Sequence, residues 1–344
     1  MPEEKNNLNN IVKMAGFNLK KLSEQANIPY STLRFLTKTS PEKWTNEQLS
    51  AIATALNITA DELKVELGKT VLTPFIKWVG GKRQLLPELI KHMPKTYNTY
   101  YEPFIGGGAL FLKIQPKKAV INDFNEELAN AWETVRDDNE KLRLILDYYG
   151  REDSKEFYLN LRSADRDGRI KDFDDLERAS RFIYLNKAGY NGLWRVNQKG
   201  QNNVPYGAHK TINFNFPNIY DVSAYLNQNE IEITSGDYKD SLESAKKDDF
   251  VYLDPPYIPV NPTSNFTSYT KDGFGLIQQQ ELAETALALA KKGVKVMLSN
   301  ADVPLIEKLY SNEIFKIHHV QANRVLNSNG KKRGKVGEVI ITTY

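Results

Sequence analysis

Asp254-Pro255-Pro256-Tyr257 directly follows the apolar run Phe250–Leu253, which is typical of a buried strand. A carboxylate at the end of a strand can accept one N–H of a planar amine. A prolyl carbonyl can accept the other, because proline has no N–H of its own to compete. The ring of Tyr257 can stack on the base that carries the amine. This tetrapeptide therefore predicts activation of an exocyclic amine for attack, although a plain proline turn would have the same residues.

A glycine-rich segment, Glu102–Gly108, follows the short strand candidate Tyr100-Tyr101. Glycines between a strand and a helix let a ligand approach the backbone at the carboxyl edge of a sheet. The dinucleotide pattern G-x-G-x-x-G is incomplete, because Phe111 takes the place of the third glycine. On these residues alone, a cofactor loop and a structural turn both remain open.

Asp123 ends the next apolar run, Ala119–Asn122. An acidic side chain at the end of a second strand can accept hydrogen bonds from the ribose hydroxyls of a nucleoside cofactor. The same residue could instead cap a helix that begins near Glu126 and Glu127.

Short apolar runs alternate with amphipathic stretches from about residue 72 onward, which predicts a mainly parallel α/β sheet. Helices are expected over 85–92 and 278–291. The predicted strands are Tyr100-Tyr101, Ala119–Ile121, Ile231–Ile233, Phe250–Leu253, Val294–Leu298 and Val339–Ile341. Residues 135–225 interrupt this alternation and are expected to form a separate, mostly helical insertion. The catalytic domain is then predicted to comprise residues 71–134 and 226–344.

Residues 1–70 are predicted to form a small all-α domain, since their apolar residues recur at helical spacing. A helix over Leu19–Ala26, a break at Asn27–Pro29 and a helix over Tyr30–Leu36 resemble the repressor-type helix-turn-helix family. Two further helices are expected, with Asn46 and Thr59 as caps. If the module binds DNA, the side chains expected to face a groove are Tyr30, Ser31, Thr32 and Arg34. A helical bundle for protein contacts is the alternative.

Composition excludes several classes of protein. The 344 residues include 46 Lys and Arg, 43 Asp and Glu, and no cysteine. Without a thiolate the chain cannot methylate carbon five of cytosine, form disulfides or bind zinc through cysteine. No apolar run reaches the roughly 18 residues of a membrane span, and the first ten residues lack a signal-peptide core. A cytoplasmic location is therefore the expectation.

Three further segments join these motifs: 75–86 (FIKWVGGKRQLL), 120–125 (VINDFN) and 203–207 (NVPYG). Together they resemble the Dam-type adenine-N6 DNA methyltransferases in the α arrangement, and most of all the GATC methylases of Gram-positive restriction–modification systems. The likeness covers about residues 72 to 344; the N-terminal module is an addition to the usual family pattern. It implies a Rossmann-like sheet that binds S-adenosylmethionine, with a target-recognition insertion.

The resemblance also implies roles for individual residues. The implied catalytic residues are those of the tetrapeptide, Asp254, Pro255, Pro256 and Tyr257. The implied cofactor-binding residues are Trp78, Lys82, Phe104, Gly106, Gly108, Asp123, Asp237, Tyr238 and Asp254. The implied DNA-binding residues are Lys77, Asn191, Leu193, Arg195, Asn197, Pro205 and Lys210. Among these, Arg195 is expected to bind guanine in the major groove. No metal is implied.

The implied reaction moves a methyl group to the N6 amine of an adenine extruded from duplex DNA, within a GATC-like site. The resemblance also implies a cognate restriction endonuclease, a bacterial or phage origin, nucleoid association, and a monomeric or weakly dimeric state. Two alternatives stay open: a DNA-binding transcriptional regulator with a non-catalytic methylase-like module, and methylation of adenine in RNA. The basic segment Lys331–Lys335 could contact phosphate or be a solvated loop.

Overall fold

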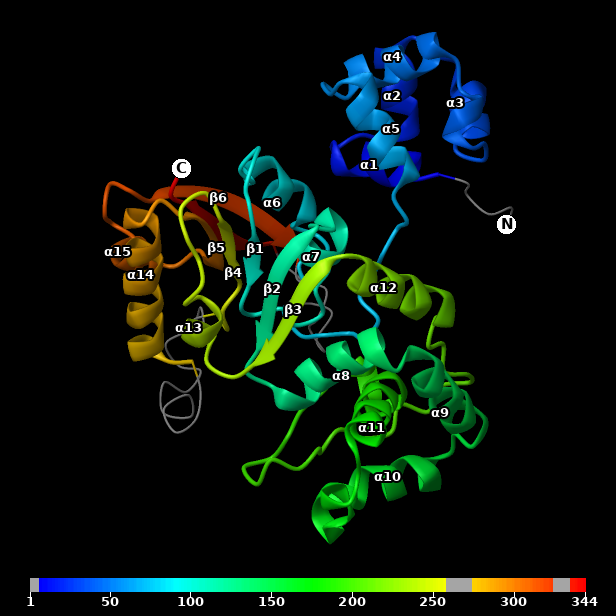
Figure 1. Cartoon of the computed structure of the whole chain (residues 1–344), viewed down its shortest axis with the longest axis vertical. Helices are drawn as coiled ribbons and strands as arrows, with labels where there is room; N and C mark the ends of the chain where they lie inside the picture. Colours follow the sequence, from blue (N-terminus) through cyan, green and yellow to red (C-terminus); the bar gives the residue numbers. More distant parts are fainter. Residues whose placement is uncertain (1–5, 258–273, 324–334) are drawn as a thin grey trace. The chain divides into compact units, whose positions relative to one another are not determined.

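A computed structural model describes residues 6–257, 274–323 and 335–344, so most of the basic segment at Lys331–Lys335 lies outside the described residues. The chain divides into two compact units, residues 1–72 with 85–91 and residues 73–84 with 92–344 (Figure 1). Within the described ranges, no helix combines the length and apolar character needed to cross a membrane.

Residues 6–72 of the first unit contain five short α-helices around one apolar core. They are α1 (Leu8–Met14), α2 (Leu19–Ala26), α3 (Tyr30–Leu36), α4 (Asn46–Ala55) and α5 (Ala60–Gly68). Helices α2 to α5 were predicted, whereas α1 was not. Side chains such as Leu22, Leu33 and Ile52 are fully buried between them.

The turn between α2 and α3 has the geometry expected from its sequence. Asn27 ends α2 in the left-handed conformation (φ 50°), which asparagine tolerates better than most residues. Ile28 is then buried, and its carbonyl accepts a hydrogen bond of 2.6 Å from Ser23 Oγ. On α3, Tyr30, Ser31 and Arg34 are exposed and Thr32 is half-buried, so this end of the helix is accessible to a partner.

The helix caps correct one prediction. Asn46 is the first residue of α4, and the cap is Thr45, which forms a capping box with Gln48. The Thr45 hydroxyl accepts the amide of Gln48, and the Gln48 side chain accepts the amide of Thr45, so two backbone donors are satisfied one residue before the predicted cap. Thr59 caps α5 through the same device with Glu62, as predicted.

The second unit is built on a seven-stranded sheet with the order β3-β2-β1-β4-β5-β7-β6 in the described residues. The strands are β1 (Tyr100–Glu102), β2 (Lys118–Asp123), β3 (Glu230–Ser235), β4 (Phe250–Leu253), β5 (Lys295–Ala301), β6 (Lys316–Asn323) and β7 (Lys335–Thr342). Strands β1 to β5 pair in parallel, and β7 is antiparallel to both β5 and β6. The mainly parallel Rossmann-like sheet is thus confirmed.

Every residue of β4 is buried, which explains its unbroken apolar sequence. The helices that accompany the strands are α7 (Ala109–Ile114), α13 (Tyr238–Ser241), α14 (Leu276–Lys291) and α15 (Pro304–Leu309). Helix α6 (Leu86–His92) belongs to the first unit except for its last residue. Helix α14 packs against β5. The strand β6 was not predicted, because its sequence, KIHHVQAN, mixes polar and apolar residues without a clear period.

Helices dominate the region between β2 and β3. They are α8 (Glu126–Asp137), α9 (Asn139–Arg151), α10 (Lys155–Asp167), α11 (Asp175–Ala188) and α12 (Phe216–Gln228). Helix α11 contacts α8, α9 and α10, and nearly all of its second half is buried (Figure 1). The predicted insertion boundaries fall inside α8 and α12, and the division into catalytic domain and insertion stays a prediction.

Gly108 lies at the start of α7 with φ +67°, and an added Cβ would come within 2.7 Å of two ring carbons of Trp132. Gly200 has a similar φ of +76° but open space around it. We expect Gly200→Ala to lower the free energy of unfolding by about 1 kcal/mol through backbone strain alone. Gly108→Ala should cost about 2–4 kcal/mol, because the indole must also move. Urea unfolding measures both, and equal losses would contradict the packing described.

Candidate active site

The order of the sheet reverses between β1 and β4, so the segments after these two strands meet at the carboxyl edge. The glycine-rich turn follows β1, and Asp254–Tyr257 follows β4. In open α/β sheets such a switch point forms the crevice in which ligands bind. The topology therefore brings the two predicted motifs to one place, although they are far apart in the sequence.

Asp254 is a largely buried carboxylate, with 16% of its side chain exposed. Burial raises the pKa of Asp254 to about 6; Lys82 opposes this shift and Glu338 adds to it. The Nζ atom of Lys82 lies 2.8 Å from Asp254 Oδ1, in an ion pair that offsets part of the cost of burying the carboxylate.

Lys82 was predicted to border the cofactor pocket, and the structure places its ammonium against two residues of the tetrapeptide, Asp254 and Tyr257. Its ammonium lies 4.4 Å from the centre of the Tyr257 ring and donates a 2.9 Å hydrogen bond to the Gly80 carbonyl. A nitrogen donor thus already lies between the carboxylate of Asp254 and the aromatic face of Tyr257. These two groups can bind an amine in that geometry.

Tyr257 is fixed by a partner that the sequence did not reveal. Its hydroxyl donates a 2.9 Å hydrogen bond to Glu338 Oε2 on β7, and burial raises the pKa of Tyr257. The hydroxyl therefore remains a donor at neutral pH. Because Glu338 lies on the antiparallel strand β7, no local pattern could have linked it to this turn.

The glycine-rich turn is tied to Asp123 at the end of β2. Asp123 Oδ2 accepts a hydrogen bond of 3.0 Å from the amide of Gly106, and Oδ1 accepts one of 3.0 Å from the amide of Asn125. Burial raises the pKa of Asp123, against the effect of these two amides. The cap of α8 is Asn125, so the alternative in which Asp123 caps this helix is excluded.

Aromatic rings line the same turn. An added Cβ on Gly106 (φ +49°) would lie 2.8 Å from Trp78 Cδ1, so only glycine lets the indole approach this closely. Phe104 lies 5.2 Å from Tyr238, measured between ring centres. Asp237 is exposed and caps α13 by accepting a hydrogen bond from the amide of Lys239. Its predicted cofactor contact would have to use the remaining carboxylate lone pairs.

Glu102 at the end of β1 is fully buried, and Tyr100 donates a 2.6 Å hydrogen bond to its Oε2. Burial raises the pKa of Glu102 to about 8, with Tyr100 opposing the shift and Asp254 adding to it. Glu102 is therefore mostly protonated at neutral pH. The sequence suggested no role for it beyond opening the glycine-rich turn.

Two of the predicted DNA-contacting segments lie side by side. An added Cβ on Gly192 would come within 2.9 Å of Lys77 Cδ, so the lysine stem crosses this glycine. The fully buried Asn186 links both segments: its amide bonds the N–H and C=O of Lys77 at 3.1 and 2.9 Å and the Gly192 carbonyl at 3.0 Å. Asn186 had not been predicted as a site residue.

The segment after Gly192 forms a short antiparallel turn closed by a bridge between Val196 and Asn202. Arg195 is exposed, and its Nε donates a 2.6 Å hydrogen bond to Asn203 Oδ1. The side chain of Asn197 is engaged within the turn, where its Oδ1 accepts the amides of Lys199 and Gln201. Asn197 thus stabilises the turn, and its expected DNA contact stays a prediction.

The remaining predicted DNA residues lie in the same region of the chain with different degrees of exposure. Asn191 is exposed, with a left-handed backbone at φ 58°. Leu193 is half-buried, whereas Pro205 and Lys210 are exposed. The Pro205 carbonyl accepts a 2.8 Å hydrogen bond from the amide of Tyr190, which joins the 203–207 motif to the start of the turn.

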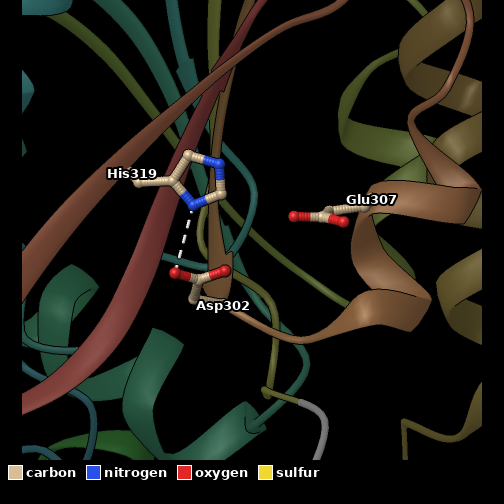
Figure 2. A group of neighbouring side chains, drawn as sticks. All are labelled: Asp302, Glu307 and His319. Carbon is tan, nitrogen blue, oxygen red and sulfur yellow. Dashed lines mark hydrogen bonds and ion pairs between the residues drawn. The ribbon is translucent and has the colours of Figure 1, made fainter.

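Figure 2 shows a group of possible metal ligands in the described ranges, Asp302, Glu307 and His319, with ligand atoms within 4.8 Å of one another. His319 Nδ1 lies 3.1 Å from Asp302 Oδ2. Glu307 and His319 are exposed. We assign this group as a surface cluster of ionisable side chains.

Comparison with known proteins identifies the family of the chain. A family model for the D12 class of N6 adenine-specific DNA methyltransferases matches residues 78–326. The chain belongs to this family. It is therefore an adenine-specific DNA methyltransferase, and DNA is its partner. A second model, for Cro/C1-type helix-turn-helix DNA-binding domains, matches residues 7–65, in agreement with the N-terminal prediction.

Individual relatives cover most of this methyltransferase. The type II methyltransferase M1.LlaDCHI of Lactococcus lactis subsp. cremoris is 49% identical over 286 residues, which are 81% of this chain and 98% of the relative. The type II methyltransferase M.MjaIII of Methanocaldococcus jannaschii is 41% identical, over 79% of this chain and 99% of its own. The DNA adenine methylase of Escherichia coli K12 is 35% identical, over 77% and 93%.

Because Glu102 keeps its proton in the folded protein, the free energy of unfolding should depend on pH. Above pH 4.5 the unfolded chain releases the carboxyl proton, whereas the folded protein keeps it until about pH 8. The wild type should therefore lose stability relative to Glu102→Gln between about pH 5 and 8, by at most about 1.4 kcal/mol per pH unit.

Urea unfolding at pH 5, 6.5 and 8 measures this difference, with Glu243→Gln at an exposed position as the control. The gap between wild type and Glu102→Gln should widen as the pH rises, while the gap for the control stays constant. A constant gap for Glu102→Gln would show that the carboxyl group is already ionised in the folded protein.

Proposed function

We propose that this enzyme transfers the methyl group of S-adenosylmethionine to the N6 amine of adenine in duplex DNA, within a GATC-like site. The adenine leaves the base stack before the reaction, and the transfer is direct. One observation carries the proposal: the carboxylate of Asp254 faces a nitrogen donor, the ammonium of Lys82, above the ring of Tyr257. The amine of an extruded adenine can take the same position.

Asp254 and Pro255 have complementary tasks in this proposal. The carboxylate accepts one N–H of the amine and the Pro255 carbonyl accepts the other, so the nitrogen lone pair points away from both. Stacking on Tyr257 and these two hydrogen bonds offset the few kcal/mol needed to extrude the base. Asp254 must be ionised for this role, since a protonated carboxyl group loses acceptor capacity.

The residues around the glycine-rich turn suit S-adenosylmethionine by their chemistry. Asp123 provides carboxylate oxygens for ribose hydroxyls, and Phe104 with Tyr238 provides aromatic surface for an adenine ring. Asp254 provides a negative charge for a sulfonium, and its buried Oδ1 atom has the Lys82 ammonium as its ionic partner. The cofactor, when bound, supplies an electrophilic methyl group. Trp78, Gly106 and Gly108 shape the turn.

Sequence recognition is assigned to the segments that Asn186 connects. Lys77 and Arg195 present cationic side chains that suit guanine, which offers two acceptors in the major groove. Leu193 suits an apolar contact, and Asn191, Pro205 and Lys210 suit the DNA backbone. Arg195 has to exchange its hydrogen bond with Asn203 for one with a base. We also propose that residues 71–134 and 226–344 form the catalytic domain and that residues 135–225 form the recognition domain.

The N-terminal domain adds a second DNA contact through Tyr30, Ser31, Thr32 and Arg34 at the start of α3. In repressor-type domains this end of the second helix enters the major groove. We further propose a monomer or weak dimer that acts on the DNA of a bacterial cell or a phage, in the cytoplasm. A cognate restriction endonuclease is part of the proposal, because two relatives are named type II methyltransferases.

Substitution of Asp254 tests the reaction. Asp254→Ala should abolish methylation of duplex DNA by labelled S-adenosylmethionine while circular dichroism stays unchanged. Asp254→Asn retains one acceptor oxygen and should leave a reduced rate. Wild-type turnover in Asp254→Ala would refute the assignment.

The pH dependence provides a second measurement on the same residue. Because the pKa of Asp254 is about 6, kcat/KM of the wild type should fall as the pH drops through 6. In Asp254→Asn this acid limb should disappear, since an amide does not titrate. An identical acid limb in both proteins would assign the titration to another group.

Arg195→Ala tests recognition. Its loss should relax discrimination at one base pair of the site, by about 1–3 kcal/mol in relative kcat/KM. Lys210→Ala, which removes a cation assigned to the DNA backbone, should weaken binding to all sequences equally, as expected for a phosphate contact. Sequencing of methylated bases in a library of sites measures both, and an unchanged preference in Arg195→Ala would exclude this residue as a reader.

A further inference from the structure

The carbonyl of Pro256 has a buried partner outside the tetrapeptide. Gln279, in the first turn of α14, donates a 2.8 Å hydrogen bond from Nε2 to this carbonyl. The Gln279 side chain is fully buried, although Pro256 itself is exposed. A buried glutamine needs partners for both ends of its amide, so the group opposite the carbonyl of Gln279 decides which way the amide faces.

That group is Asn300 at the end of β5, also fully buried. Asn300 Nδ2 donates a 3.0 Å hydrogen bond to Gln279 Oε1, and Asn300 Oδ1 accepts a 2.8 Å hydrogen bond from the amide of Ala301. A backbone N–H can only donate. The amide of Ala301 therefore fixes the orientation of the Asn300 side chain. Asn300 in turn fixes the orientation of Gln279, so Gln279 must present its NH₂ group to Pro256.

The hydrogen bonds from Ala301 through Asn300 and Gln279 to Pro256 form a chain that we call the relay. The sheet places the relay next to the Asp254–Tyr257 turn. Strands β4 and β5 pair in parallel up to Leu253 and Leu298, so Asn300 lies just beyond the last pair, beside the turn that begins at Asp254. The relay occupies the carbonyl of Pro256. Pro255 is buried, and among the described residues no donor contacts its carbonyl, so the relay does not use the oxygen that we assign to the substrate amine.

We propose that Gln279 and Asn300 are positioning residues for methyl transfer: by binding the carbonyl of Pro256 they fix the Asp254–Tyr257 turn so that Asp254 and the Pro255 carbonyl converge on the amine. The inference rests on the proposed role of this turn. It extends that role to two residues outside the tetrapeptide, which act through the carbonyl of Pro256.

Two substitutions remove the relay at different points. Gln279→Met keeps the length of the side chain but cannot donate to Pro256. Asn300→Leu keeps the volume and leaves the Gln279 amide free to turn. Thr342→Val is the control, because it removes a buried hydroxyl that bonds His318 at the last residue of β7, where no site residue has been placed.

Single-turnover methylation, cofactor affinity and DNA affinity are measured for the full-length variants, and 2-aminopurine at the target position reports base extrusion. Gln279→Met and Asn300→Leu should slow methyl transfer about 10- to 100-fold, as expected for a misplaced acceptor. Cofactor and DNA affinities and the extrusion signal should change less than about twofold, within the error expected for independent sites. The control should lose thermal stability yet keep its rate.

Wild-type rates in both relay variants would overturn the inference. So would a loss of cofactor affinity parallel to the loss of rate, which would indicate a general structural role. Asp254→Asn separates this failure from that of the proposed function. If Asp254→Asn is impaired while the relay variants are not, only the relay is excluded; if Asp254→Asn is unimpaired as well, the role of the whole turn is excluded.

Discussion

The structure depends on one buried negative charge. Asp254 lies at the end of a fully buried strand, where burial raises its pKa to about 6. The ammonium of Lys82, 2.8 Å away, provides the opposing charge. Two more carboxyl groups lie near this pair. Glu102 is mostly protonated at neutral pH, and Glu338 accepts a hydrogen bond from the hydroxyl of Tyr257. The site thus keeps one ionisable acceptor available in a region that disfavours charge.

This arrangement has a consequence for the order of events under the proposed function. The substrate amine is proposed to take the position of the Lys82 ammonium above Tyr257, so the lysine must leave that position when the adenine enters. The bond between Lys82 and the carbonyl of Gly80 lies within the 75–86 motif, next to Trp78 and the glycine-rich turn. Lys82 therefore connects the proposed base pocket with the proposed cofactor pocket.

The sequence predicted those parts of the fold that depend on local patterns. The buried strand Phe250–Leu253 and the break at Asn27–Pro29 follow from apolar runs and from residues that tolerate or enforce turns. Long-range partners could not be predicted in this way. Glu338, Asn186 and Asn300 reach their partners only because β7, α11 and β5 pack beside segments that are distant in the chain. The bonds of Asn197 within its own turn were not predicted either, and the DNA contact that the family likeness suggested for it stays a prediction.

The most direct measurement is a crystal structure of the protein with duplex DNA and an unreactive analogue of S-adenosylmethionine. The account predicts an extruded adenine stacked on Tyr257, with its amine within hydrogen-bond distance of the Asp254 carboxylate and the Pro255 carbonyl, and Lys82 displaced from Asp254. An adenine bound elsewhere, or an amine that contacts neither acceptor while Lys82 stays paired, would contradict it.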